Sequence, residues 1–202
     1  NSMGLFYSAM THRVGLKPME DEYILMGMAA YGDEDLARQV SNQMSSDYFE
    51  TQPWISGKLA LKMKQNVHRG VSPDSFPGVD DMVIARAAQM QAEQRIFRYC
   101  EYAKRLTGSD NLIYGGGVAL NCLANTQLFD LYKNIWIMPN PGDCGSSLGA
   151  AALSYGKKLN WRGPYLGTNI SGRYPVKELL SELITNKIVG VANGRAEFGP
   201  RA

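Results

Sequence analysis

Short apolar runs alternate with helical stretches over the second half of this chain. A helix is predicted at 80–107, because apolar or small residues recur there at three- and four-residue steps. Strands are predicted at 111–114 and 134–138, with a helix at about 118–131 between them. Strands that alternate with helices imply a sheet covered by helices, so we expect an α/β fold with a mixed sheet.

The other elements are predicted from local signals. We expect a strand at 4–10, helices at 20–30, 36–44, 145–155 and 175–185, and a strand at 187–192. The polar, proline-containing segment 45–78 is predicted to be irregular, with room for a hairpin. Since the chain starts without a methionine and stops after a Gly- and Arg-rich turn, we expect a fragment of a longer protein.

Composition argues against several classes of protein. The net charge is only +2 and the charges are interleaved, which gives no indication of a nucleic-acid partner. No apolar run approaches the roughly 20 residues that span a bilayer, so no membrane partner is expected. The three cysteines form no CxxC pair, which favours reduced thiols and a cytoplasmic protein. Cys122 and Cys144 are expected to be buried and inert.

Three glycines, Gly115, Gly116 and Gly117, lie between the predicted strand at 111–114 and the helix that follows. Glycine permits positive φ and leaves no Cβ to hold a ligand away, and a helix N-terminus attracts anions. The turn is therefore a candidate phosphate site, and close packing of the helix on the sheet is the alternative. It is neither a P-loop nor a dinucleotide fingerprint, because it lacks the required Lys-Ser/Thr pair and the GxGxxG spacing.

Asp143 follows the strand predicted at 134–138 and precedes a helix of small residues. Tight packing of that helix would hold the carboxylate at the sheet edge, where open α/β sheets bind ligands. Asp is a hard oxygen donor suited to magnesium or iron, and it is equally suited to capping a helix N-terminus. Both interpretations are open from the residues alone.

Other polar residues allow a functional and a plainer interpretation. The acidic side chains at 20–22 suit acid–base chemistry, but helix N-termini favour acidic residues anyway. Arg195 and Arg201 flank a turn and suit a phosphate or carboxylate, and solvated surface arginines are the alternative. His12 and His68 are too far apart to form an HxxxH metal pair, so the chain alone would give an incomplete metal site.

In order along the chain, five segments resemble the O-carbamoyltransferases of the nodulation-factor and antibiotic-biosynthesis type. The similar segments are 2–7 with Thr11, 21–32, 116–121, 141–151 and 194–202. The resemblance extends over essentially the whole chain. Ile24 or Leu25 stands where the second motif of the family has lysine, and Ala30 where it has proline.

The resemblance implies an actin-like ATPase fold, the ribonuclease H-like superfold of sugar kinases and Hsp70. Residues 1–186 would be the C-terminal lobe of the actin-like domain, and 187–202 would begin the C-terminal carbamoyltransferase domain. That later domain makes carbamoyl-adenylate from ATP and carbamoyl phosphate. The actin-like domain, with an HxxxH metal motif upstream of this chain, passes the carbamoyl group to a hydroxyl of a sugar or natural product.

Several residues receive roles from the resemblance. Asp143 would be a catalytic ligand of a divalent metal, iron or magnesium, and Arg201 a catalytic contact to phosphate or carbamoyl. The glycines at 115–117, Asn121 and Glu22 would contact the nucleotide. The resemblance does not indicate an oligomeric state. Alternatives are a tRNA threonylcarbamoyl-transfer ATPase, a sugar or acetate kinase, and a degenerate nucleotide-binding module.

Overall fold

The computed structural model describes residues 2–48, 71 and 74–199. Two compact units make up the chain, residues 1–137 and 138–202. The first is built from helices and a small parallel sheet, and the second from helices and a small antiparallel sheet. The combination of helices with small sheets confirms the predicted α/β class. The actin-like fold stays a prediction. Among the described residues, no helix combines the length and the apolarity needed to cross a membrane.

The first element is a helix, α1 (Met3–Arg13), so the strand predicted at 4–10 is wrong. Its consecutive residues from Phe6 to Met10 are all buried, which explains the continuous apolar run. A short buried helix and a buried strand share that pattern, so periodicity could not separate them. The Ser2 hydroxyl accepts a hydrogen bond from the Leu5 N–H (3.4 Å) and caps the helix.

Three short elements follow α1. They are α2 (Glu22–Met28), the 3-10 helix η1 (Ala29–Tyr31) and α3 (Glu34–Tyr48). The helix predicted at 20–30 is therefore confirmed with a 3-10 end, and the one predicted at 36–44 is longer than expected. The predicted hairpin in 45–78 falls mostly on 49–70 and 72–73, outside the described residues.

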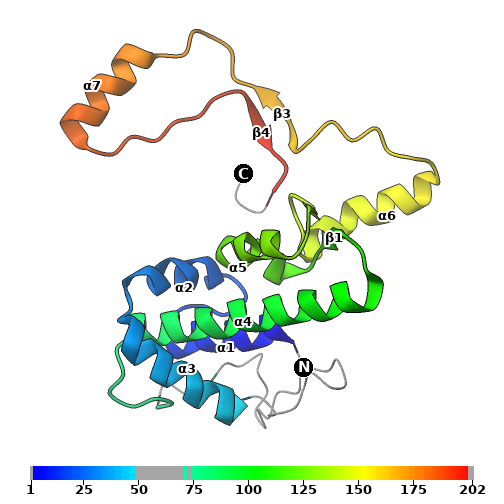
Figure 1. Cartoon of the computed structure of the whole chain (residues 1–202). Helices are drawn as coiled ribbons and strands as arrows, with labels where there is room; N and C mark the ends of the chain where they lie inside the picture. Colours follow the sequence, from blue (N-terminus) through cyan, green and yellow to red (C-terminus); the bar gives the residue numbers. More distant parts are fainter. Residues whose placement is uncertain (1, 49–70, 72–73, 200–202) are drawn as a thin grey trace. The chain divides into compact units, whose positions relative to one another are not determined.

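The long helix α4 (Asp81–Thr107) is confirmed almost to the residue. The Asp80 carboxylate accepts the Met82 N–H (2.8 Å) at its start, and Gly108 ends it in the left-handed region (φ 64°). Small buried side chains along one face, such as Ala85 and Ala88, allow close packing. Helices α1, α2, α3 and α5 lie against α4 (Figure 1).

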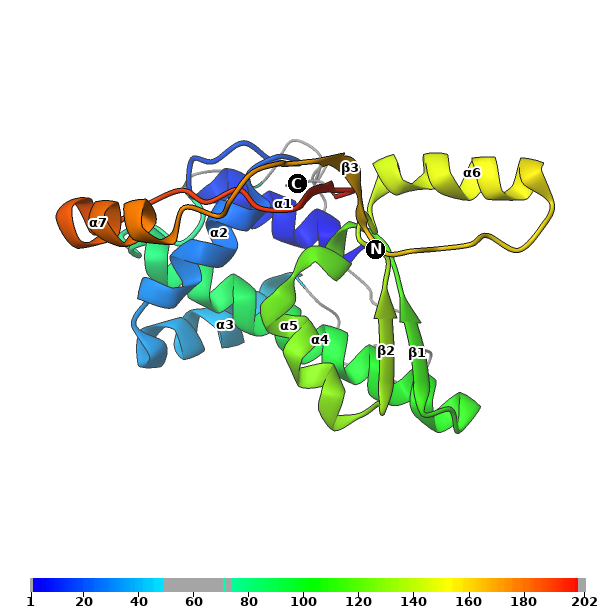
Figure 2. The same cartoon turned by 90° about the horizontal axis from the view of Figure 1, so that it is seen from above.

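Strands β1 (Asn111–Tyr114) and β2 (Asn134–Ile137) are confirmed and pair in parallel, side by side in Figure 2. Their connection is not the single helix predicted at 118–131. It consists of η3 (Gly117–Leu120), α5 (Cys122–Gln127) and η4 (Leu128–Asp130). The helix breaks at Asn121, because this side chain caps α5 by accepting the Ala124 N–H (3.0 Å).

Only one face of this sheet is covered by the first unit. Leu112, Tyr114 and Ile135 pack against the core, whereas Ile113 and Trp136 on the other face are 80% and 50% exposed. The two exposed residues are direct partners in the strand register. The alternation of half-buried and exposed residues follows from the two-residue period of a strand.

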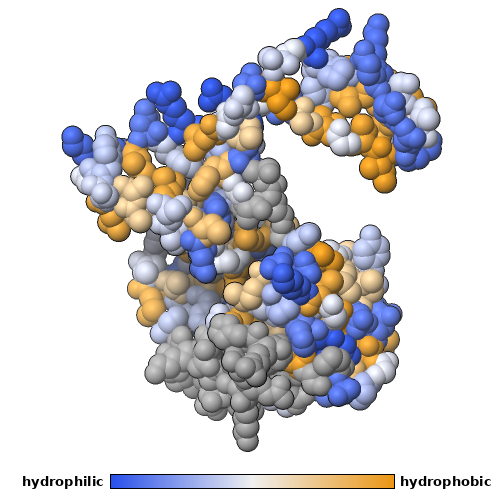
Figure 3. Space-filling view, turned by 180° about the vertical axis from the view of Figure 1, so that it is seen from behind, coloured by the Kyte–Doolittle hydropathy of each residue, from blue (hydrophilic) through white to orange (hydrophobic). Residues whose placement is uncertain are grey.

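The second unit begins with η5 (Asp143–Gly145) and α6 (Ser146–Tyr155). The helix at 145–155 is confirmed, but its expected tight packing is wrong, since α6 has no buried residue in the described chain. The confirmed helix at 175–185 is α7 (Val176–Asn186). Its apolar side chains gather on one side of the helix in Figure 3. Val176, Leu180 and Ile184 of α7 are exposed.

The strands of the second unit differ from those expected. The pairing strands are β3 (Tyr165–Asn169) and β4 (Arg195–Glu197), which run antiparallel. The strand predicted at 187–192 is wrong. Lys187 adopts a left-handed conformation (φ 67°) that ends α7, and the β-branched run after it has no strand partner in the described structure. A strand needs a neighbour as well as propensity.

Gly32 allows the closest approach between η1 and α4. A Cβ at this position would overlap the Met82 carbonyl and lie 2.7 Å from the Arg86 Cβ. We expect Gly32→Ala to destabilise the protein by about 1–3 kcal/mol, because backbone must move to admit the methyl group. Urea unfolding followed by circular dichroism measures the change.

The matched control is Gly27→Ala in the preceding helix α2, where a Cβ would meet nothing within 4 Å. Ala is favoured over Gly in a helix, so this variant is expected to be neutral or more stable by up to about 1 kcal/mol. Equal loss of stability in both variants would contradict the packing role of Gly32.

Candidate functional site

The glycine turn leaves β1 and leads into η3. Gly116 has φ 96° and ψ 160°, a conformation that side-chain-bearing residues rarely adopt. At Gly115 and Gly117 the backbone is ordinary, and a Cβ would meet nothing within 4 Å. Close packing therefore does not explain these two glycines within the described structure. They leave an open, accessible stretch of backbone.

The helix that was expected to point at this turn is shorter than predicted. Only the 3-10 turn η3 starts here, closed by a hydrogen bond from the Ala119 N–H to the Gly116 carbonyl (2.9 Å). The first N–H groups of any helical turn lack partners within it. The backbone donors thus remain, but without the dipole of a long helix behind them.

Asn121 ends the turn with a buried side chain, 8% exposed. Its Oδ1 accepts the Ala124 N–H (3.0 Å) and the Gln89 Nε2–H (3.0 Å). Its Nδ2 donates to the Gln89 Oε1 (2.9 Å). The side chain is therefore largely occupied by the protein, and its predicted contact with a nucleotide could use only the remaining amide hydrogen.

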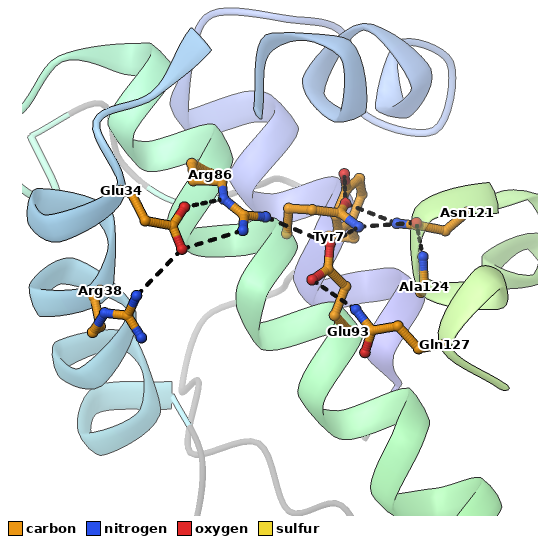
Figure 4. A network of polar contacts seen from close by, with 9 residues as sticks. Tyr7, Glu34, Arg38, Arg86, Glu93, Asn121, Ala124 and Gln127 are labelled. Atoms are coloured by element: carbon orange, nitrogen blue, oxygen red, sulfur yellow. Dashed lines mark hydrogen bonds and ion pairs between the residues drawn. The ribbon is translucent and has the colours of Figure 1, made fainter. Parts of the chain in front are cut away.

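Gln89, on α4, has hydrogen bonds to three residues that Figure 4 labels, Tyr7, Glu93 and Asn121. It is fully buried, accepts a hydrogen bond from the Tyr7 hydroxyl (2.7 Å) and donates to the Glu93 carboxylate (2.9 Å). The other Glu93 oxygen accepts from Gln127 (3.0 Å) on α5. Side chains from α1, α4 and α5 thus meet next to Asn121, the residue that ends η3.

Charge around Tyr7 keeps its hydroxyl protonated. Burial raises the pKa of this phenol strongly, and the carboxylates of Glu93 and Glu22 raise the pKa further. Tyr7 therefore acts as a hydrogen-bond donor to Gln89 over the whole physiological range.

The acidic residues at 20–22 serve the start of α2. Glu22 accepts from the Ser8 hydroxyl and from the Met19 N–H (2.6 Å). Asp21 accepts from the Lys17 N–H (2.9 Å), and Glu20 forms an ion pair with the Lys17 side chain (2.6 Å). These contacts fit the structural interpretation of Glu20 and Asp21, and they leave the second Glu22 oxygen available.

The Asp143 carboxylate is exposed and has no hydrogen bond or ion pair among the described residues. The N-cap interpretation is wrong, because Gly142 and Gly145 occupy the cap positions of η5 and α6 and no side chain caps either helix. Gly145 must be glycine here, since a Cβ would overlap the Asn140 carbonyl. Asp143 is thus held in a tight corner with its oxygens free.

The predicted site residues do not all fall in one unit. The glycines, Asn121 and Glu22 belong to the first unit, and Asp143 belongs to the second. Arg201 lies outside the described residues, so its predicted pairing with the exposed Arg195 stays a prediction. No group of three or more His, Cys, Asp or Glu side chains suited to a metal occurs in the described part of the chain.

A polar groove of about 800 Å³ runs between α3 and α4. Glu34 pairs there with Arg86 (2.8 Å) and with Arg38 (3.4 Å), as Figure 4 shows. Arg86 does not need a bound anion, because its guanidinium already forms ion pairs with Glu34 and Glu93. The groove is therefore a charge-balanced helix interface.

Sequence reasoning missed Gln89, Tyr7 and Glu93. A signal for Gln89 was present, because this polar residue lies in the buried stripe of α4 between Ala85 and Ala92. Buried amides are almost always hydrogen-bonded, so such a position predicts a specific partner. Which partner it finds depends on the packing of α1 and α5, which the sequence pattern does not give.

The three thiols also differ from expectation. Cys122, next to Asn121, and Cys144, next to Asp143, are exposed, so their predicted burial is wrong. Cys122 follows Asn121, which caps α5, and Cys144 follows Asp143, the first residue of η5. Cys100 on α4 is buried, and burial raises the pKa of its thiol to about 11.

Comparison with known proteins gives one family and several relatives. A family model described as "Carbamoyltransferase N-terminus" matches residues 1–152. The uncharacterized protein sll1178 of Synechocystis is 31% identical over an alignment that covers 100% of this chain and 40% of that protein. Nodulation protein NolO of Bradyrhizobium diazoefficiens is 28% identical, covering 100% of this chain and 42% of its own.

A third relative matches a shorter part of the chain. Nodulation protein U of Sinorhizobium fredii is 33% identical over 71% of this chain and 31% of its own length. The chain therefore spans about two fifths, or less, of the length of these curated relatives.

The thiols give a direct test of the site geometry. We expect iodoacetamide at about pH 8 to alkylate Cys122 and Cys144 and to spare Cys100. With a pKa of about 11, only about one Cys100 thiol in a thousand is ionised at that pH. Peptide mass spectrometry counts the modified cysteines. Urea should expose Cys100, and rapid native alkylation of Cys100 would contradict the packing of α4.

Proposed function

Because the chain belongs to the carbamoyltransferase family, we propose that the whole protein is an ATP-dependent O-carbamoyltransferase. In this proposal a carbamoyl group from carbamoyl phosphate passes through carbamoyl-adenylate to a hydroxyl of a sugar or natural product. The acceptor hydroxyl oxygen forms a bond to the carbamoyl carbon and its proton passes to solvent, while the bond from that carbon to the adenylate oxygen breaks and AMP leaves. Three free thiols fit a reducing, cytoplasmic setting.

The observation that supports a nucleotide site is the open backbone of the glycine turn. Gly115 and Gly117 face no protein atom that a Cβ would touch, and Gly116 turns the chain with a positive φ. Successive backbone N–H groups in such turns form concavities that bind phosphates. We assign the adenylate phosphate to this turn, with the open Glu22 oxygen as a candidate contact to the ribose.

Asp143 is the residue of this chain that suits a divalent metal, iron or magnesium. Its carboxylate is exposed, is a hard oxygen donor and has no partner in the described structure. The described residues form no group of three His, Cys, Asp or Glu side chains around it. A bound metal would supply Lewis-acid polarisation of the carbamoyl carbonyl. Arg201 would contact phosphate or carbamoyl.

The glycine turn is tested with Gly117→Val in the full-length protein. The space around Gly117 is open, so the fold is expected to stay intact. The added side chain keeps the phosphate from the backbone, and we expect ATP affinity to fall by about tenfold or more. Calorimetry measures the affinity, and Gly149→Val in α6, another substitution in open space, is the control. Unchanged ATP affinity in Gly117→Val would refute the phosphate assignment.

Asp143 is tested with Asp143→Asn, again in the full-length protein. A neutral amide is a poorer ligand for a hard cation, so bound metal and carbamoyl transfer should both be lost. The melting temperature should not change, because the carboxylate makes no contact in the described structure. Metal analysis, an acceptor-carbamoylation assay and thermal melts on the same sample provide the three readouts.

The control for charge removal is Asp130→Asn, at another exposed aspartate in a 3-10 helix, η4. It should keep its metal and its activity. Full metal content and full transfer in Asp143→Asn would remove Asp143 from the site while leaving the nucleotide assignment untouched.

A further inference from the structure

We propose that Gln89 is a positioning residue for the nucleotide turn, which it holds in place from behind through Asn121. The inference rests on the proposed function, because it assigns the support of the same turn. Gln89 lies on α4 in the middle of a helix that carries none of the five family-like segments. Its role comes from its contacts and not from a motif.

Two amide groups facing each other connect α4 to the turn. Gln89 Oε1 accepts from Asn121 Nδ2 (2.9 Å), and Gln89 Nε2 donates to Asn121 Oδ1 (3.0 Å). Such a paired contact fixes both the distance and the rotation of the Asn121 side chain. Because Asn121 Oδ1 also accepts the Ala124 N–H, the pair determines where η3 ends and where α5 begins.

The remaining hydrogen-bonding groups of Gln89 are used to orient its own amide. The Tyr7 hydroxyl donates to Oε1 (2.7 Å), and Glu93 accepts from Nε2 (2.9 Å). A protonated phenol on one side and a carboxylate on the other allow only one orientation of the amide. Gln89 therefore presents a defined acceptor and a defined donor to Asn121, and it has no free capacity left.

The same support reaches the turn through α1. Gly4 of α1 lies against Val118 of η3, where a Cβ would be 3.3 Å from the Val118 side chain. Tyr7, one turn later in α1, reaches Gln89. The turn is thus held at Val118 by apolar contact and at Asn121 by hydrogen bonds, while Gly115 and Gly117 stay open.

Gln91 provides a matched control on the same helix. It is also buried, at 2% exposure, and donates to the Ser41 carbonyl and hydroxyl (2.8 Å each) of α3. These hydrogen bonds tie α4 to α3 and not to the turn. Losing either glutamine leaves buried partners unsatisfied, so both losses should reduce stability. Only the loss of Gln89 should affect the nucleotide.

The test uses Gln89→Leu and Gln91→Leu in the full-length protein. We expect both variants to melt at a lower temperature. Gln89→Leu alone should raise the KM for ATP by roughly tenfold while the KM for carbamoyl phosphate stays within about twofold. An unchanged KM for ATP in Gln89→Leu, or an equal rise in Gln91→Leu, would overturn the positioning role.

A second readout does not require a bound nucleotide. Cys122 is exposed and directly follows Asn121, so its alkylation rate reports the order of the turn. Gln89→Leu should speed iodoacetamide labelling of Cys122 several-fold relative to Cys144, and Gln91→Leu should not. If wild-type protein binds no ATP, the proposed function fails, and this rate still decides whether Gln89 holds the turn.

An exchange variant covers the case in which Gln89→Leu does not fold. In Gln89→Glu with Glu93→Gln, net charge is kept and the hydrogen bond between positions 89 and 93 can reform with its polarity reversed. The carboxylate at position 89 still accepts from Tyr7 and from Asn121 Nδ2, but it cannot donate to Asn121 Oδ1 as Gln89 does, so the recovery in the double variant should be partial. We expect the double variant to recover ATP affinity relative to Gln89→Glu alone, in which two carboxylates face each other. Equal ATP affinity in the single and double variants would contradict the inference.

Discussion

Helix α4 organises the first unit, because small side chains along it let four other helices approach a single 27-residue helix. Ala85, Ala88 and Ala92 occupy little volume, so the backbones of neighbouring helices come close and exclude water. Gly32 likewise lets η1 approach α4 closely, because a methyl group at this position would not fit. The sheet and the glycine turn are then attached to this helical base, and their geometry depends on it.

Sequence reasoning was most successful where the signals are local. Asp80 and Gly108 marked the ends of α4, and the strands β1 and β2 and the position of the glycine turn were also found. It failed where a decision needed partners distant in sequence. The buried run in α1 fits a helix or a strand, and the pairing of β3 with β4 joins segments about 30 residues apart.

In the candidate site, too, local features were predicted and contacts between distant segments were not. The residues at 115–117 were identified from glycine chemistry, and the structure adds that two of them face open space. Asn121 was identified by resemblance as a ligand contact, but its side chain mostly serves the protein. Gln89 and Tyr7 were missed, because a hydrogen bond between α1, α4 and the turn becomes visible only once the helices are packed. The metal and nucleotide roles themselves stay predictions.

The break at Asn121 also has a consequence for how such a protein can vary. A single helix from 118 to 131 would transmit any insertion or tilt along its length straight to the glycines. Here the segment is divided into η3, α5 and η4, and the joint between the first two is fixed by α4. A change after the joint therefore reaches the turn only through side-chain contacts, such as the hydrogen bond from Gln127 to Glu93, and not along one continuous helix. The turn keeps its shape as long as those contacts to α4 are kept.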